Sequence, residues 1–490
     1  MTTLEEARAL VRRRWGMVID GRVTPSESGR ELDVVAPATG EIVATFPHGT
    51  SIDVDRAVES AHASFAAWRR VPAIERGRLV SRLADAVEAA GEELAAIDAL
   101  ENGTPLHLLR KDVGLAVQRL RYYAGLALQL RGESIPADGG IDFTRMEPYG
   151  VVARLVPFNH PLMFAASGVG APLVAGNTVV LKPSEHTSLS ALRIGELAAE
   201  ILPAGVVNVV TGLGADVGAR LTAHPRVPRV AFTGSVETGL QIQRQAASEV
   251  VKVVTLELGG KNPLIVFPDA DVHEAVRGAI NGMNFTWQGQ SCGSTSRLFV
   301  HRSLVEQVEA GLSEALNSFV VGDPFDPNSQ MGALVSRSHH ERVSRFISEG
   351  REDPAARVIA GDGELPESGL FVRPTVLSFP DAAHDSRILD TEIFGPVLAV
   401  VPFDTYEDVI AHANALPLGL TASVWTSSLD IATAAVRDLE AGYVWVNASS
   451  QHIPGAPFGG AKNSGVGREE DLGELYSYAQ TKNIFIRTEN

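Results

Sequence analysis

Residues 151–160 have the sequence VVARLVPFNH and residues 178–185 the sequence TVVLKPSE. Each begins with a short apolar run and ends in polar side chains, and similar runs follow further along the chain. We predict strands at 151–156, 178–181, 206–210, 229–232 and 251–256, with helices between them at 190–200, 215–222 and 235–247. Apolar strands that alternate with helices are typical of a parallel sheet covered on both faces. The fold class is therefore α/β.

A parallel sheet of this kind offers a ligand crevice at the carboxyl ends of its strands. Asn159, Lys182 and Gly234 all lie just past or at such ends. A second glycine, Gly212, opens a GxGxxxG stretch after the strand at 206–210. That stretch is a weak phosphate-binding signal, and a tight turn that opens a helix explains it equally well. The arrangement suggests a nucleotide site.

Helices are expected before this region. Residues 54–68 and 74–90 carry apolar residues at spacings of three and four. Asp53 and Gly91 are the expected start and stop signals of this pair. These helices contain no residues that we can assign to chemistry.

A second region of alternating strands and helices spans residues 263–445 and predicts a second α/β domain. Its strands are expected at 298–301, 375–377, 397–403 and 423–425. Residues 129–147 and the tail after Tyr476 are predicted as strands without a place in either sheet.

Composition limits the class of protein. The chain has 490 residues, of which 45% are hydrophobic and 21% charged, as in soluble globular proteins. The net charge of −17 disfavours nucleic acid or an anionic membrane as partner. The single cysteine excludes an intrachain disulfide framework and fits a reducing cytoplasm. The first residues, MTTLEEARALVRRRWG, lack the apolar core of a signal peptide. We expect a soluble cytoplasmic protein.

That cysteine, Cys292, lies in the Gly/Ser-rich segment GQSCGSTSR, and Glu257 lies upstream in LELGGKNP. One nucleophile and one base suggest covalent acyl chemistry. The alternative for Cys292 is a small buried hydrophobe. The alternative for Glu257 is a buried member of a structural ion pair.

Further motifs accompany these two in a fixed order. They are PFNHP at 157–161, LKPSE at 181–185, FTGS at 232–235, EIFGP at 392–396 and PFGGAKNSG at 457–465. Together they resemble the NAD(P)-dependent aldehyde dehydrogenase superfamily, from Ile19 to the C-terminus.

The resemblance implies a fold and an assembly. The parts are a Rossmann-like dinucleotide-binding domain (1–128 and 148–257), a second α/β catalytic domain (258–469) and a small β oligomerisation arm (129–147 and 470–490). In the family such an arm completes the sheet of a partner subunit, so a homodimer or a homotetramer is expected.

The resemblance also implies a cofactor site. Lys182 and Glu185 would hold the adenosine ribose, although by themselves they could form a solvated turn pair. A carboxylate at the 2′-hydroxyl repels a 2′-phosphate, so NAD is expected over NADP. Gly234 and Ser235 open a helix where the pyrophosphate would bind. The remaining cofactor-binding positions are Leu258, Glu392 at the nicotinamide ribose and Phe394 near the nicotinamide ring.

In the implied reaction, Cys292 attacks the aldehyde and forms a thiohemiacetal. The Asn159 amide and the Cys292 backbone N–H would stabilise its oxyanion; the alternative for Asn159 is a cap of the turn before Pro161. After hydride transfer, Glu257 would activate the water that hydrolyses the thioester. Acylating relatives typically lack this base, so Glu257 favours the hydrolytic (non-acylating) branch and a free acid as product.

The substrate, a small-molecule aldehyde, would lie in a pocket rich in aromatic residues. The expected lining residues are His160, Met163, Phe164, Phe285, Trp287, His452 and Phe458. They suggest a hydrophobic or aromatic aldehyde, unless these side chains are ordinary core. No arginine falls clearly in this set, which disfavours semialdehyde acids.

Two other functions stay open beside a hydrolytic aldehyde dehydrogenase. One is a relative that passes the acyl group to coenzyme A. The other is a non-catalytic NAD-binding or structural protein that kept the fold.

Overall fold

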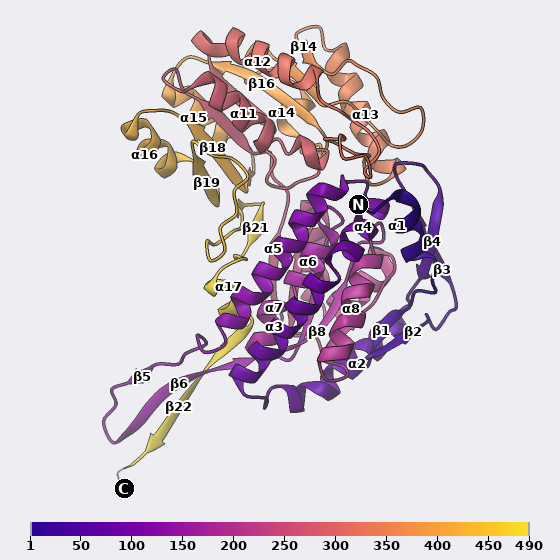
Figure 1. Ribbon diagram of the computed structural model, residues 1–490. Coiled ribbons are helices and arrows are strands. Elements are labelled where there is room, and N and C mark those ends of the chain that lie inside the picture. Colours follow the sequence, from indigo (N-terminus) through magenta and orange to yellow (C-terminus); the bar gives the residue numbers. More distant parts are fainter. Residues whose placement is uncertain (1, 489–490) are drawn as a thin grey trace.

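In the computed structural model, which describes residues 2–488, helices pack against two large sheets and a narrow third sheet projects away from them (Figure 1). The first sheet has the strand order β2-β1-β9-β8-β7-β10-β11-β21. Its strands are β1 (Met17–Ile19), β2 (Arg22–Thr24), β7 (Val151–Leu155), β8 (Thr178–Lys182), β9 (Val207–Val209), β10 (Arg229–Thr233), β11 (Val253–Glu257) and β21 (Gly465–Val466).

The central strands of this sheet confirm the predicted α/β fold. β9, β8, β7, β10 and β11 pair in parallel in this order. Every residue of β7, β8 and β10 is buried, because helices cover both faces. The helices of this half are α1 (Leu4–Val11), α2 (Ser51–Trp68), α3 (Ala73–Ala89), α4 (Gly91–Asn102), α5 (Leu106–Gly125), α6 (Pro161–Ser167), α7 (Gly170–Ala175), α8 (Leu189–Ile201), α9 (Ala219–Ala223) and α10 (Val236–Ala246). A π-helical turn, Gly214–Gly218, precedes α9.

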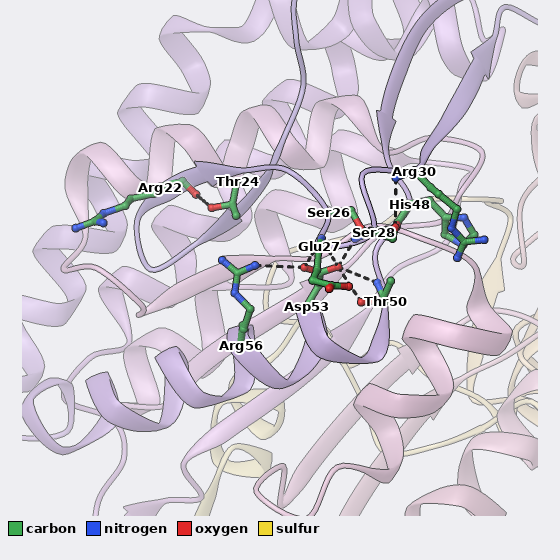
Figure 2. Close-up of polar contacts among 10 residues, drawn as sticks. All are labelled: Arg22, Thr24, Ser26, Glu27, Ser28, Arg30, His48, Thr50, Asp53 and Arg56. Atoms are coloured by element: carbon green, nitrogen blue, oxygen red, sulfur yellow. Dashed lines mark hydrogen bonds and ion pairs between the residues drawn. The ribbon is translucent and has the colours of Figure 1, made fainter.

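The start signal expected at Asp53 is wrong. Thr50 is the N-cap of α2, and Asp53 is the third helical residue of a capping box with Thr50. The carboxylate of Asp53 is fully buried and accepts hydrogen bonds from Ser26 Oγ at 3.1 Å, Glu27 N at 3.1 Å and Thr50 N at 3.0 Å (Figure 2). Nη1 of Arg56 lies 3.5 Å from Oδ1 of the same carboxylate. Asp53 therefore ties the N-terminal segment to α2.

The stop signal expected at Gly91 also needs correction. Helix α3 ends at Ala89, but Gly91 is the first residue of α4. A Cβ at Gly91 would lie 2.8 Å from Cγ1 of Val113 on α5. Glycine is required here for the close approach of α4 and α5.

The second sheet confirms the predicted second α/β region. Its strand order is β14-β15-β16-β13-β12-β18-β19, parallel except for β14. The strands are β12 (Pro263–Val266), β13 (Arg297–His301), β14 (Arg357–Ala360), β15 (Thr375–Ser378), β16 (Val397–Phe403), β18 (Thr421–Trp425) and β19 (Tyr443–Val446). Around it lie α11 (Val272–Gly282), α12 (Val305–Asn317), α13 (Arg337–Glu352), α14 (Arg387–Asp390), α15 (Tyr406–Asn414) and α16 (Leu429–Asp438).

The projecting sheet contains the segments predicted as unplaced strands. β22 (Ala479–Arg487) pairs antiparallel with β6 (Gly140–Pro148), and β5 (Ser134–Ile135) lies on the other side of β6 (Figure 1). Helix α17 (Leu472–Ser477) precedes β22, and its Leu475 lies in the hydrophobic core between the first sheet and its helices. Met1 of the predicted first domain and residues 489–490 of the predicted arm lie outside the described residues.

Two short ladders complete the fold: β3 (Glu31–Val35) with β4 (Ile42–Pro47), and β17 (Leu418–Gly419) with β20 (Ala461–Lys462). Within residues 2–488, the structure contains no helix with the length and apolar character needed to span a membrane. The division of the chain into domains stays a prediction.

Candidate active site

The predicted catalytic residues meet at one edge of the first sheet. Asn159 follows β7 and Glu257 is the last residue of β11, so both lie at carboxyl ends of parallel strands. Cys292 comes from the loop between α11 and β13. A cavity opens here, and Asn159, Glu257 and Cys292 all line it. The structure thus brings together a thiol, a carboxyl group and an amide.

Glu257 is buried without a partner. Its side chain is 4% exposed, and within residues 2–488 neither of its carboxyl oxygens has a hydrogen-bond partner. Burial raises the pKa of Glu257 well above its usual range; nearby Glu469 adds to the effect, and the positive charge of Arg468 opposes it. The interpretation of Glu257 as a member of a structural ion pair is therefore wrong. A carboxyl group with a raised pKa and free oxygens is suited to general base chemistry.

Cys292 is half-buried and lines the cavity, which does not fit a hydrophobe packed in the core. The side-chain amide of Asn262 donates to the carbonyl oxygen of Cys292 at 2.7 Å and to that of Ser294 at 3.0 Å. Burial raises the pKa of the Cys292 thiol to about 12, and the negative charges of Glu392 and Glu257 add to the rise. In the free protein the thiol is therefore protonated at neutral pH.

The loop that carries Asn159 is fixed from α4. Asn102 Nδ2 donates to the carbonyl oxygen of Phe158 at 2.7 Å, and Asp98 accepts from the Leu162 amide at 2.9 Å at the start of α6. The N-cap of α6 is His160. Asn159 is therefore not the N-cap of α6, and it lines the cavity.

Lys182 and Glu185 do not form a solvated turn pair. Lys182 is 4% exposed, its Nζ donates to the carbonyl oxygen of Pro183 at 2.7 Å, and it lies 3.8 Å from Glu185. Burial lowers the pKa of Lys182, and the charge of Glu185 partly offsets this. Glu185 is half-buried and lines a separate hollow with His186 and Asp33. Two polar groups are thus held at the carboxyl end of β8.

The start of α10 shows one departure from the expected cofactor site. The Gly234 amide donates to the carbonyl oxygen of Glu257 at 3.0 Å, so it is not a free N–H group. A Cβ at Gly234 would lie 2.4 Å from the ring of Phe232, so glycine is needed for space. Ser235 is the N-cap, and its Oγ accepts from the Thr238 amide at 3.2 Å. Within residues 2–488 the buried hydroxyl of Thr233 has no hydrogen-bond partner.

Leu258, Glu392 and Phe394 lie around the turn that follows Glu257. Leu258 lines the cavity, and the Gly260 amide donates to Glu392 Oε1 at 3.0 Å. Burial raises the pKa of Glu392 to about 7. The ring of Phe394 packs edge-on against Phe158 with ring centroids 5.7 Å apart. The EIFGP segment therefore contacts both the Glu257 turn and the Asn159 loop.

Of the expected substrate pocket, five side chains line the cavity and two do not. Those that line it are His160, Met163, Phe164, His452 and Phe458. Trp287 is half-buried and stacks on the cavity residue His160 with ring centroids 5.1 Å apart. The prediction that Phe285 lines the substrate pocket is wrong. Phe285 is fully buried in the core of the second sheet, edge-on to Phe319.

Sequence reasoning missed three charged residues in the same cavity wall. Arg119 on α5, Glu469 and Glu470 all line the cavity. The expectation that no arginine belongs to the pocket is therefore wrong. Arg119 is one helical turn after Leu115, which also lines the cavity, but no motif of the sequence connects α5 with Glu470.

Comparisons with known proteins identify relatives over nearly the whole chain. The sequence model of the aldehyde dehydrogenase family matches residues 23–484. A phenylacetaldehyde dehydrogenase from Pseudomonas fluorescens is 44% identical over 482 residues, covering 96% of this chain and 95% of the relative. An aldehyde dehydrogenase from Bacillus cereus, solved as an NAD⁺ complex, has a TM-score of 0.95 and 39% identity, with 99% of each chain covered. The indole-3-acetaldehyde dehydrogenase AldA from P. syringae, solved with NAD⁺ and IAA, has a TM-score of 0.95 and 37% identity, covering 99% of this chain and 100% of that one.

A two-sheet α/β chain with a thiol, a carboxyl group and an amide in one cavity carries the kinds of groups that enzymes use in covalent catalysis. The match over residues 23–484 then decides the family: the chain belongs to the aldehyde dehydrogenase family.

Proposed function

We propose that the protein oxidises an uncharged, hydrophobic or aromatic aldehyde to the carboxylic acid with NAD as cofactor. The observation that carries the proposal is the meeting of Cys292, Glu257 and Asn159 in one cavity. The unpartnered Glu257 favours water over coenzyme A as the acceptor of the acyl group, because a free carboxyl group in the cavity can activate water.

The residues of this chain fit NAD. The N-terminus of α10, with Ser235 as its cap, suits a pyrophosphate, and the unpartnered Thr233 hydroxyl lies directly before it. Lys182 and Glu185 suit the adenosine ribose, and Glu185 favours NAD over NADP because its charge repels a 2′-phosphate. Glu392, with Leu258 and Phe394 beside it, suits the nicotinamide ribose and ring. When bound, NAD accepts the hydride that leaves the carbon attached to Cys292.

The side chains of the cavity perform the other steps. The Cys292 sulfur, once deprotonated, attacks the aldehyde carbon and forms a thiohemiacetal whose oxygen carries the negative charge. The Asn159 amide and the Cys292 N–H donate to that oxygen. After oxidation to the thioester, Glu257 takes a proton from water, the hydroxide adds to the carbonyl carbon, and the thiolate leaves. The product is the free acid.

The lining of the cavity supports the substrate class. Phe164, Phe458 and Met163 present apolar surface, and the phenylacetaldehyde dehydrogenase and indole-3-acetaldehyde dehydrogenase relatives are named for aromatic aldehydes. An arylacetaldehyde is the first substrate to examine.

We further propose that the sheet of β5, β6 and β22 is an oligomerisation arm, with a homodimer or homotetramer as the assembly. The arm extends away from the rest of the chain and exposes Ile141, Phe485 and Ile486. The arm would comprise residues 129–147 and 470–490. The nucleotide-binding domain would comprise residues 1–128 and 148–257, and the catalytic domain residues 258–469. Light scattering of the purified protein tests the assembly; a monomer at micromolar concentration contradicts it.

A cytoplasmic location, supported by the single cysteine, is tested by cell fractionation.

The deciding experiment is NADH formation with NAD across aliphatic, arylacetaldehyde and semialdehyde substrates, with and without coenzyme A. The Cys292→Ala protein runs alongside. We expect turnover that is independent of coenzyme A and abolished by the substitution, while NAD binding is retained. Substantial turnover by Cys292→Ala, or an absolute need for coenzyme A, would overturn the proposal.

A further inference from the structure

An ion pair lies in the wall of the substrate cavity. Nη2 of Arg119 on α5 lies 2.5 Å from Oε1 of Glu470, in the loop before α17. The two side chains are only 12% and 11% exposed. Both residues line the cavity together with Met163 and Phe458. The ion pair can therefore contact a substrate bound in the cavity, and it is largely shielded from bulk solvent.

Glu470 is held firmly in this position. Its φ is +74°, a left-handed backbone conformation that is costly for a glutamate. Its carbonyl oxygen accepts from the Gly455 amide at 3.0 Å, and its own amide donates to Glu474 at 2.7 Å. Its second carboxylate oxygen lies 3.2 Å from Nδ1 of His452. The fold maintains a strained backbone that directs this carboxylate at Arg119.

Among residues 2–488, Arg119 has no ion-pair partner besides Glu470. Its Nη1 donates to the sulfur of Met163 at 2.9 Å, and a thioether is a weak acceptor. Without Glu470, the guanidinium would be a nearly buried cation that faces the cavity with unused donors. Such a group binds a carboxylate strongly, since two parallel N–H donors match its two oxygens.

The other charges of the wall do not change this balance. Glu469 is neutralised by Arg154, which holds both of its oxygens from behind the wall. With Glu470 in place, the guanidinium of Arg119 is already paired when a substrate carboxylate enters the cavity.

We propose that Glu470 is a specificity-determining residue, which excludes aldehydes with a terminal carboxylate by occupying Arg119. The proposal deepens the proposed function and rests on it. It predicts that Arg119 becomes a binding site for a substrate carboxylate when the charge of Glu470 is removed.

The test compares kcat/KM for hexanal and for adipic semialdehyde, two linear aldehydes that differ in the terminal carboxylate. The wild-type protein should prefer hexanal by at least about tenfold, the scale of one charge interaction in a partly buried site. Glu470→Gln should raise kcat/KM for adipic semialdehyde by about tenfold and leave hexanal within about threefold. Arg119→Met added to Glu470→Gln should remove the gain.

Glu364→Gln is the matched control, because it removes one exposed carboxylate from a loop outside the cavity. It should leave the preference unchanged. If Glu470→Gln does not fold, as judged by its melting temperature, Glu470→Asn replaces it, since asparagine tolerates a left-handed backbone. The same gain is expected.

Equal wild-type use of the two aldehydes would overturn the inference. So would a folded, hexanal-oxidising Glu470 variant that gains nothing on adipic semialdehyde, or a gain that persists without Arg119. The absence of wild-type turnover with hexanal and every other aldehyde would instead overturn the proposed function.

Discussion

The side-chain amide of Asn262 donates at 2.7 Å to the backbone carbonyl oxygen of Cys292, and its Oδ1 accepts from the Thr421 amide at 3.0 Å. Asn262 belongs to the LELGGKNP segment that also carries Glu257. One short segment therefore supplies the carboxyl group of the site and fixes the loop of the thiol. Through Thr421, at the start of β18, this loop is also tied to the second sheet.

Asn262→Ala should lower kcat by about 10²-fold, because a nucleophile displaced by about 1 Å loses rate on that scale. NAD affinity should change little, since Asn262 contacts none of the proposed cofactor residues. Steady-state NADH formation and NAD titration measure the two effects. Unchanged kcat would show that the Cys292 loop keeps its position without this hydrogen bond.

Glu257→Gln should slow hydrolysis of the thioester more than its formation. A covalent adduct should then appear as added mass on the intact protein. In the wild-type protein, the hydrolysis rate should rise with pH through the raised pKa of Glu257 and fall below it, because only the deprotonated carboxylate accepts a proton. This slope should vanish in the variant. Normal NADH production without an adduct would exclude Glu257 as the base.

The thiol of Cys292 should react slowly with iodoacetamide in the free protein at neutral pH. Since the pKa is raised to about 12, the rate should rise steadily with pH and show no plateau at pH ~9. Because a negative charge at Glu257 raises this pKa, Glu257→Gln should be alkylated at least as fast as the wild type. Slower alkylation would show instead that Glu257 deprotonates the thiol.

Gly459→Ala should damage the site through Glu257. A Cβ at Gly459 would lie 2.7 Å from Glu257 Oε1 and equally close to the carbonyl oxygen of Gly467. The carboxyl group must move, so kcat should fall, and overpacking should cost about 1–3 kcal/mol of stability. Gly114→Ala on α5 is the control, because its Cβ would meet nothing within 4 Å. Urea unfolding and NADH formation distinguish the variants; equal behaviour would contradict the close contact.

The central strands, and the positions of the candidate site residues at their ends, follow from the sequence for one physical reason. Buried parallel strands need long apolar runs, and polar groups can follow only where such a run ends. Asn159, Lys182 and Glu257 all stand at those ends. β1 was missed because it has only three residues, and its assignment depends on pairing with β9 through Val18 and Val209.

Side-chain direction was not predictable from the sequence. Phe285 and Phe164 are both aromatic residues near site motifs, yet one packs against Phe319 in a core and the other lines the cavity. The pair of Arg119 and Glu470 joins positions 351 residues apart. Local patterns carry no information on such a contact, which exists only after α5 and the loop before α17 have packed.

The short strand β21 returns from the second half of the chain to the edge of the first sheet. It pairs Gly465 with Glu257 and Val466 with Leu256, and the Leu258 amide donates to the Ser464 carbonyl oxygen at 2.9 Å. Glu257 is therefore held between chain segments that are distant in sequence. A movement that separated the two halves would first have to break the backbone ladder at Glu257. Local unfolding of this ladder would therefore also release the backbone that positions the Glu257 side chain in the cavity.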